Sequence, residues 1–297
     1  MQEKFNAKNR PPNLKEIIKG QDITQHYLDE TNKKFKIYRY NNTIYAVRCD
    51  EQTSQPIDFV KMWNSHKGEK NRITEQEAYL GAGVFGKVYK KTEDKAVKFS
   101  NIDKNYRDHE EVKKNLDILN TKFLLKENKI EEFFVLGLWN IKKRNKDSDN
   151  KDDVFFYMPQ IKKSPTNSLT EKTHRLMFDK SIWALKKLNE LGYAHPDLAN
   201  DCEHDSSQNI IETAEGMRFI DIDDGFKSKD GTNDVVIKDQ WLYAYNNNYP
   251  PNNLTPDKWR SDIQEWYKNN PGKSLSDDPS TLLNFYNKKC FHYLNAL

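Results

Sequence analysis

Cysteine is scarce in this 297-residue chain, since only Cys49, Cys202 and Cys290 occur, far apart and without a C-x-x-C pair. Three thiols at such spacings support neither a disulfide framework nor a zinc site, and they favour a reducing compartment. Long apolar runs are also missing, so the sequence predicts no membrane-spanning helix. The first residues lack the apolar core of a cleaved signal peptide, so export by that route is not expected.

The chain also lacks a large excess of charge of one sign. Lys and Arg total 48, and Asp and Glu total 45, so no field over the whole molecule would attract nucleic acid or an anionic membrane. Charged residues make up 31% of the chain, but Trp, Tyr and Phe supply 12%. Disordered chains carry fewer aromatic residues, so the sequence predicts a soluble, globular protein.

Residues 1–72 are polar and are interpreted as an N-terminal extension. They contain two alternating runs, residues 35–40 and residues 43–47. Asn41-Asn42 joins the two runs, and asparagine tolerates the backbone conformation that a tight turn requires. This pattern predicts a β-hairpin.

Residues 73–160 contain five short strand-like runs, which predict a five-stranded antiparallel sheet. The runs are residues 77–80, 87–90, 95–99, 133–141 and 154–158. Between the third and fourth runs lies a polar helix at about residues 105–120. Its apolar residues Val112, Leu116 and Leu119 recur at i, i+4 and i+7, so we expect this stripe to pack on the sheet.

Residues 161–297 are mainly helical, with two short strand candidates near their middle. The first helix is long, and Ser168 with Glu171 three residues later forms a capping-box pattern at its start. Gly192 marks its end. Strands in one part and helices in the other indicate an α+β fold.

Glycines cluster between the first two predicted strands, where residues 81–88 read G-A-G-V-F-G-K-V. Gly81, Gly83 and Gly86 lack a Cβ, so backbone N–H groups there can approach phosphate oxygens. A dinucleotide fingerprint would have a helix after the glycines, whereas here a strand follows, which favours the glycine-rich loop of a kinase. A glycine-rich hairpin turn is the alternative when this motif is taken alone.

A lysine follows in the third predicted strand, where residues 95–98 read K-A-V-K. Lys98 is suited to hold the α- and β-phosphates of a nucleotide, although an ordinary strand lysine is the alternative. Such a lysine needs a carboxylate on the next helix to orient it. Glu110 and Glu111 are the candidates, and Glu111 is preferred because it lies near the edge of the apolar stripe. An exposed helix glutamate is the alternative for either residue.

Polar motifs follow the long helix, in residues 192–198 (G-Y-A-H-P-D-L), at Asn209 and in residues 219–223 (F-I-D-I-D). Asp197 is suited to accept or orient the proton of an acceptor hydroxyl. Asn209 and Asp221 offer oxygen ligands for metal ions that face phosphates. Each motif alone also fits a turn or an acidic loop, but their order is the order of a kinase signature.

Taken together, these motifs resemble the protein kinase superfamily over about residues 77–245. The resemblance implies a bilobal protein-kinase-like fold, with a five-stranded antiparallel N-lobe in residues 73–160 and a mainly helical C-lobe in residues 161–297. It implies ATP as the phosphate donor, Mg²⁺ or Mn²⁺ as the metal, and Val88 and Met158 as further nucleotide contacts.

Several residues depart from the pattern of the family. Pro196 replaces the arginine that pairs with a phosphorylated activation loop, and the segment from Gly225 to Asp239 is short, so regulation by activation-loop phosphorylation is not expected. Asp239 resembles the family's Asp-x-Trp aspartate and would brace the catalytic-loop backbone. An insertion separates Asp197 from Asn209, which leaves Asn200 as the alternative metal ligand.

The short activation segment, the missing arginine and the extension resemble the small effector kinases that Gram-negative pathogens secrete. This resemblance implies a serine/threonine protein kinase delivered to the host cytoplasm, with a host protein as substrate or activating partner. No nucleic-acid partner is expected. One alternative is an aminoglycoside- or choline-type small-molecule phosphotransferase, which Ala199 and the I-D-I-D run at residues 220–223 favour. Another is a pseudokinase scaffold that binds nucleotide without catalysis.

Overall fold

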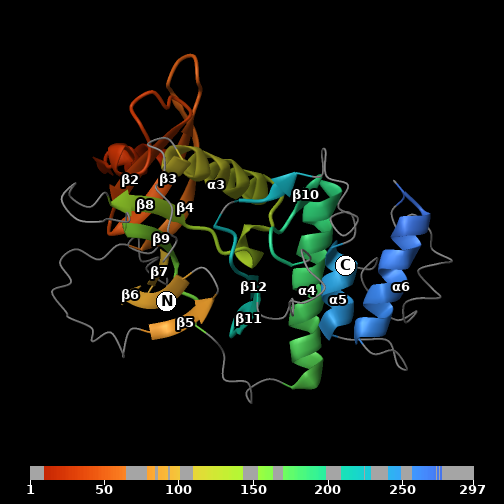
Figure 1. Ribbon diagram of the computed structural model, residues 1–297. Coiled ribbons are helices and arrows are strands. Elements are labelled where there is room, and N and C mark those ends of the chain that lie inside the picture. The colour runs from red at the N-terminus through yellow and green to blue at the C-terminus, as the bar shows by residue number, and fades with distance from the viewer. Residues whose placement is uncertain are drawn as a thin grey trace, which may run out of the picture. The chain divides into compact units, whose positions relative to one another are not determined.

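The computed structural model of the chain divides into two compact units, which are described separately (Figure 1). The first comprises Met1–Phe123 and Gly137–Gln160, and the second comprises Leu124–Leu136 and Ile161–Leu297. Both combine helices with antiparallel sheets, so the fold is α+β. The residues described are 10–64, 79–83, 86–92, 94–100, 110–142, 153–162, 170–198, 209–223, 225–228, 240–248, 256–271, 273 and 275.

The extension forms a four-stranded antiparallel sheet. Its strands, in spatial order, are β1 (Gln21–Asp22), β2 (Phe35–Tyr40), β3 (Thr43–Cys49) and β4 (Pro56–Asn64). Asn41 and Asn42 connect β2 to β3 with φ angles of 45° and 58°, the left-handed conformation that a two-residue hairpin turn needs. The short helix α1 (Leu14–Ile17) supplies Ile17 to a buried cluster with Tyr38 and Val47 of the sheet.

A second, five-stranded sheet lies in the same unit. Its elements are β5 (Tyr79–Gly83), β6 (Gly86–Thr92), β7 (Lys95–Ser100), β8 (Leu138–Lys142) and β9 (Asp153–Pro159). The spatial order is β5-β6-β7-β9-β8, and every neighbouring pair is antiparallel. The strand expected over residues 133–141 is only partly present, because Glu131–Phe133 forms a 3-10 turn and β8 starts at Leu138.

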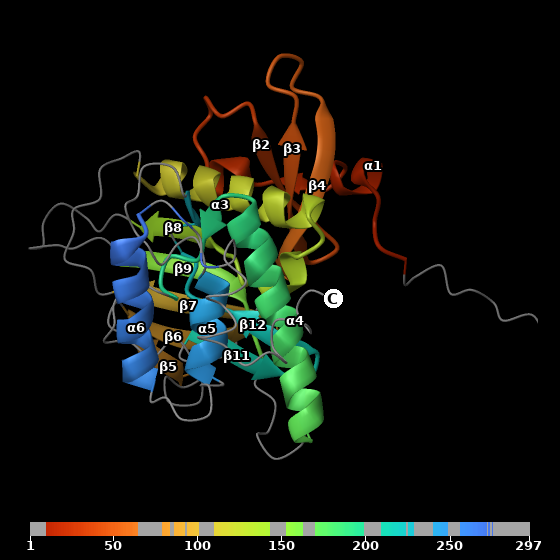
Figure 2. The same cartoon turned by 90° about the vertical axis from the view of Figure 1, so that its right-hand side faces the viewer.

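Helix α3 (Glu110–Glu127) runs beside β8 and the extension sheet in both views (Figures 1 and 2). The expected stripe of Val112, Leu116 and Leu119 is wrong in part. Leu119 is buried, but Val112 and Leu116 are only half-buried. The buried face is instead shifted by one residue to include Asn115 and Ile118, so a polar side chain lies at the centre of the contact.

In the part that the structure describes, the second unit is built on the helices α4 (Glu171–Glu190), α5 (Gln240–Asn248) and α6 (Pro256–Asn269). Helix α4 lies against α5 (Figure 2), where the rings of Phe178 and Tyr245 are 6.1 Å apart. Thr170, rather than the expected Ser168, caps α4 by accepting a hydrogen bond from the Thr173 N–H. After α4, Gly192 takes a φ of 89°, which a residue with a side chain rarely adopts.

The described residues of the second unit also form four short strands. They are β10 (Tyr193–Ala194), β11 (Ile210–Thr213), β12 (Gly216–Phe219) and β13 (Lys227–Ser228), paired as β10–β13 and β11–β12. Rings of Phe134 and Phe219 stack at 5.1 Å and anchor β12 in the core of the unit. Among the described residues, no helix combines the length and the apolar character needed to cross a membrane.

Candidate active site

The glycine motif forms the hairpin between β5 and β6. Gly81 pairs with Val88, and Gly83 pairs with Gly86 at the closed end, while residues 84 and 85 lie outside the described part of the chain. A Cβ added to Gly81 would meet no protein atom within 4 Å. Packing within the protein therefore does not require glycine at this position, whereas a ligand that approaches the backbone would.

Lys98 lies in β7, opposite Val88 of β6 and Phe156 of β9. Ala96, two residues earlier, pairs with Met158. Directly paired residues and residues two apart share one face of a sheet, so Val88, Lys98 and Met158 project from the same face. Lys98 is only 7% exposed, and a cation at such depth requires compensation by negative charge.

The two candidate glutamates of helix α3 differ in their exposure to solvent. Glu110 is exposed and Glu111 is half-buried. Glu111 lies four residues before the buried Asn115, on the same side of the helix. The pKa of Tyr27 is raised to about 12, first by burial and then by the nearby Tyr157, with Arg39 opposing and Glu111 adding to the rise. Glu111 is therefore close enough to Tyr27 to influence the pKa of that residue, and it lies on the side of α3 that carries Asn115.

Asn115 is fully buried and joins three segments of the first unit. Its Oδ1 accepts a hydrogen bond from the Trp139 N–H at 2.8 Å, and its Nδ2 donates to the Trp139 carbonyl at 3.1 Å. Nδ2 also donates to the Tyr27 carbonyl in the extension at 2.8 Å. Sequence reasoning missed this residue because an asparagine in a polar helix carries no signal of burial.

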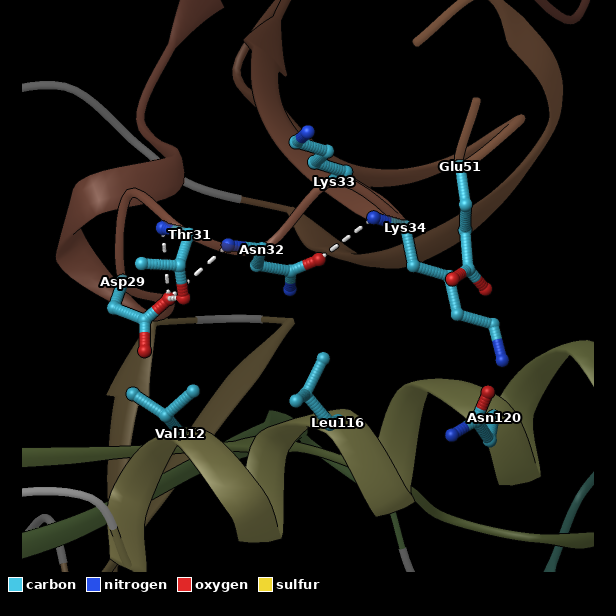
Figure 3. A pocket seen from close by; sticks show the side chains of 9 residues that line it. All are labelled: Asp29, Thr31, Asn32, Lys33, Lys34, Glu51, Val112, Leu116 and Asn120. Atoms are coloured by element: carbon cyan, nitrogen blue, oxygen red, sulfur yellow. Dashed lines mark hydrogen bonds between the residues drawn. The ribbon is translucent and has the colours of Figure 1, made fainter. Parts of the chain in front are cut away.

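A pocket of about 410 Å³ lies on another side of α3, and Figure 3 shows its lining. Val112, Leu116 and Asn120 of α3 form one wall, and the loop before β2 forms the other together with Glu51. Asp29 holds this loop by accepting hydrogen bonds from the backbone N–H groups of Thr31 and Asn32. Val112 and Leu116 therefore face a hollow rather than a packed core.

In the second unit, His195 is buried at 2% exposure and uses both ring nitrogens. The Asp197 N–H donates to its Nδ1 at 3.1 Å, and its Nε2 lies 2.8 Å from the Ile220 carbonyl. A carbonyl oxygen can only accept, so the proton is on Nε2 and the ring is neutral. His195 thus ties the start of the Asp197 loop to the residue before Asp221.

Asn209 closes the same network from another segment. Its Nδ2 donates to the Asp197 carbonyl at 3.1 Å, and its carbonyl accepts from the Ile220 N–H at 3.0 Å. Asp221 follows with a φ of 65°, a conformation that is costly for a residue with a side chain and is found at functional sites. The backbones that carry Asp197, Asn209 and Asp221 are therefore held together, while Asn200 lies outside the described residues.

Two amide side chains that sequence reasoning missed brace this loop. Gln240 Oε1 accepts from the His195 N–H at 2.9 Å, and Gln240 Nε2 donates to the His195 carbonyl at 2.7 Å. Asn189 Nδ2 donates to the Tyr193 carbonyl at 2.8 Å. The bracing role expected of Asp239 falls outside the described residues, and its neighbour Gln240 makes a two-bond contact of that kind.

Oxygen donors in the second unit suit a hard divalent cation. Asn209 and Asp221 are half-buried and carry an amide oxygen and a carboxylate. No group of three or more His, Cys, Asp or Glu side chains able to hold a metal occurs within the described ranges. Mg²⁺ commonly uses one or two protein ligands and takes the rest from phosphates and water, so Asn209 and Asp221 are chemically suited to hold such a cation.

Comparison with solved structures gives strong likenesses to a bacterial kinase. No family model and no curated protein matches the chain. The structure of the Legionella pneumophila Lpg2603 kinase bound to IP6 is 43% identical, with a TM-score of 0.75 over 95% of this chain and 97% of that chain. The chain belongs to the family of the Lpg2603 kinase. A further structure of Lpg2603 is 38% identical, with a TM-score of 0.66 over 96% and 93% of the two chains.

Membership in the Lpg2603 kinase family indicates a kinase-type phosphotransferase related to a bacterial kinase. The alignment covers almost the whole of both chains, so the likeness includes the extension as well as the segments that carry the kinase-like motifs. The extension is therefore part of the shared architecture rather than an addition to this chain.

Proposed function

We propose that this chain is a serine/threonine protein kinase, which transfers the γ-phosphate of ATP to a hydroxyl of a host protein. Membership in the Lpg2603 kinase family supports the reaction type. The protein acceptor is favoured by the G-x-G-x-x-G-x-V run at residues 81–88, which is closer to protein kinases than to small-molecule phosphotransferases. Delivery by a specialised secretion system into the host cytoplasm is part of the same proposal.

In this proposal the first unit binds the nucleotide. Gly81, Gly83 and Gly86 bring backbone N–H groups to the phosphates. Lys98 holds the α- and β-phosphates, and Glu111 orients Lys98. Val88 and Met158, which share the sheet face of Lys98, contact the base.

The second unit carries the residues for transfer. Asp197 accepts or orients the proton of the acceptor hydroxyl, and its side chain is exposed, as a group that must reach a protein substrate requires. Asn209 and Asp221 would hold Mg²⁺ or Mn²⁺, which neutralises phosphate charge when bound.

The observation that carries the proposal is the His195 network. The imidazole bonds the Asp197 N–H and the Ile220 carbonyl at once, and Asn209 adds two bonds between the same segments. A turn or an acidic loop without function would have no need to order three separated polar residues in this way. The arrangement fits preorganised phosphoryl transfer, in which positioning supplies most of the catalysis.

The test is incubation of the purified chain with γ-labelled ATP and either Mg²⁺ or Mn²⁺, alone and with host-cell lysate. Lys98→Met serves as the matched inactive variant because methionine keeps most of the side-chain volume. We expect labelled serine or threonine in a protein band with wild type and none with Lys98→Met. Label found only in small molecules would favour the small-molecule phosphotransferase. Nucleotide binding without transfer would favour the pseudokinase.

We also propose that IP6 binds this chain. The support is that the Lpg2603 kinase, whose structure bound to IP6 matches with a TM-score of 0.75, is 43% identical to this chain over almost the whole length of both. Titration calorimetry with IP6, and the transfer assay with and without it, provide the test. We expect saturable binding that is weakened by salt because the ligand is a polyanion, and a change in the rate of transfer when IP6 is present. Absence of binding at low salt would refute this part of the proposal.

A further inference from the structure

We infer that Asn115 is a positioning residue, which sets the rotation of α3 and so directs Glu111 toward the sheet that carries Lys98. The N-terminal extension forms part of this device because one of the three hydrogen bonds of Asn115 ends on Tyr27. The inference rests on the proposed kinase function. It deepens that function by giving a role to residues that belong to none of the kinase-like motifs.

The side chain of Asn115 binds the backbone of Trp139 in the way that a neighbouring strand would. Strand β8 is an edge of the five-stranded sheet, and edge strands expose unpaired N–H and carbonyl groups. Asn115 accepts from the N–H of Trp139 and donates to its carbonyl, which is the pair of bonds that a neighbouring strand would make. A flat amide bound at two points fixes the direction of the side chain and of the helix that carries it.

Helical geometry transmits this orientation to Glu111. Residues four apart lie on one side of a helix, about one turn from each other, so the side that Asn115 turns to β8 also carries Glu111. Rotation of α3 about its axis would break both bonds to Trp139 and turn Glu111 away. The two bonds to Trp139 therefore restrict rotation of α3 about its axis.

Apolar packing on the pocket side of α3 does not fix the rotation of the helix. Val112 and Leu116 are half-buried there and line the pocket shown in Figure 3. Further along the helix, the ring of Phe123 stacks on Phe35 of the extension at 5.6 Å. That contact secures the far end of α3, three turns from Glu111, whereas Asn115 lies about one turn from the glutamate.

The extension reaches the same region by a second route. Asn140 Nδ2 of β8 donates to the His26 carbonyl at 3.0 Å, one residue before the carbonyl that Asn115 binds. Adjacent carbonyls of the extension are thus held by α3 and by β8. A change in the extension at His26 or Tyr27 is expected to alter the position of α3.

The test compares Asn115→Ala with Asn120→Ala, the same substitution on the same helix at an exposed position of the pocket wall. Transfer from ATP is measured together with thermal unfolding. We expect Asn115→Ala to lower kcat/KM for ATP by roughly 100-fold, because small misplacements of a catalytic group have effects of this size. Asn120→Ala is expected to leave activity unchanged.

A double-mutant cycle separates positioning from a purely structural role. In a Glu111→Gln background the orientation of residue 111 no longer matters, so Asn115→Ala should cause almost no further loss of transfer. A structural role alone would lower activity by the same factor in both backgrounds, and that additivity would overturn the inference.

Asn140→Ala provides a second variant in case Asn115→Ala does not fold. It removes only the exposed bond to His26, and we expect a smaller loss of transfer that again disappears in the Glu111→Gln background. Full activity of a folded Asn115→Ala variant would overturn the inference while the proposed function stands. A wild-type chain that transfers no phosphate with either metal, with or without IP6, would overturn both.

Discussion

The two units hold their candidate functional residues by different means. In the second unit, the His195 ring bonds the backbone N–H of Asp197, two residues later in the sequence, and the carbonyl of Ile220, which is next to Asp221. In the first unit, Asn115 depends on Tyr27, 88 positions away in the sequence. In the second unit the ring that orders the site belongs to the motif itself, and Gln240 and Asn189 of the same unit support it, whereas the first unit depends on an extension outside the motifs.

This difference shows where regulation of the protein can act. A site braced within its own loop changes little unless that loop is altered. A site braced by a distant segment responds to whatever binds or moves that segment, because the hydrogen bonds to α3 transmit the change. We therefore expect the second unit to respond mainly to substitutions in its motifs and the first unit to respond to the extension.

The largest expected effect is that of Asp197→Asn, which keeps the shape of the side chain but removes the carboxylate. We expect transfer to fall by roughly 10²–10⁴-fold, the range for loss of a general base. Asp221→Asn should also lose transfer, through metal binding, whereas Asp223→Asn should be milder. Rates measured over a range of Mg²⁺ concentration check this. Equal losses at Asp221 and Asp223 would move the metal site to the neighbouring carboxylate.

His195→Ala should affect folding as well as activity. It leaves the Asp197 N–H and the Ile220 carbonyl without their partner and opens a cavity in a buried position, which costs about 2–4 kcal/mol of unfolding free energy. Gln240→Leu should act in the same direction, since it leaves two buried groups of His195 unpaired. Urea denaturation checks both. Stability equal to that of wild type in His195→Ala would contradict the network described for the second unit.

Much of the fold could be predicted from local pattern. Asn41-Asn42 between alternating runs indicates the β2–β3 hairpin, since the turn and the strands are encoded side by side. The strands β5 to β7 could be predicted in the same way, from short strand-like runs separated by turns. The exact helix start is less accessible, because Ser168 and Thr170 are both good caps and only the backbone path selects Thr170.

The face of α3 could not be predicted because packing there is decided by a hydrogen bond. The spacing of Val112 and Leu116 indicates a buried stripe, but the edge of β8 offers an N–H and a carbonyl that only a polar side chain can satisfy. Asn115 meets that need, so the helix turns by one residue. Edge groups of a strand are visible only after the sheet order is known.

Some residues of the candidate site could be predicted from the sequence, and others could not. Lys98, Asp197 and Asp221 belong to motifs whose spacing indicates chemistry, so they could be proposed from the sequence. Gln240 and Asn189 carry no motif, and their value lies in backbone contacts that the fold creates.

A smaller effect is expected from Asp179 in α4, which has no direct part in the proposed reaction. Its side chain is 5% exposed, and Oδ1 has no hydrogen-bond partner among the described residues. Burial raises the pKa of this carboxyl group above the ordinary value of 3.8, while the charge of Arg175 opposes the rise. The pKa of Asp179 is therefore higher in the folded protein than in the unfolded chain, so protonation of this carboxyl group stabilises the fold. This stabilisation is complete below about pH 3.8 and is lost as the pH rises through the folded pKa.

Asp179→Asn should therefore raise Tm at pH 7 by roughly 2–4 °C. The gain should shrink as the pH is lowered toward the ordinary pKa of aspartate, where wild type is protonated too. Calorimetry at several pH values measures this, with Asp117→Asn on the exposed side of α3 as the control. A lower Tm in Asp179→Asn at pH 7 would mean that the charge of Asp179 stabilises the fold.

The last prediction is an absence of effect: removal of phosphate from the purified enzyme should leave its activity unchanged. The segment after Asp221 is already held by its own unit, because Lys227 and Ser228 pair with Ala194 and Tyr193 just before His195. Pro196 is buried and carries no guanidinium that could bind a phosphate. A phosphate switch would need a cation at that position and a segment that becomes ordered only on modification. Transfer by phosphatase-treated and untreated enzyme is compared, with mass spectrometry to establish the phosphorylation state. If dephosphorylation abolished transfer and rephosphorylation between Gly225 and Asp239 restored it, the second unit would also depend on an external signal, and the contrast between the two units would fail.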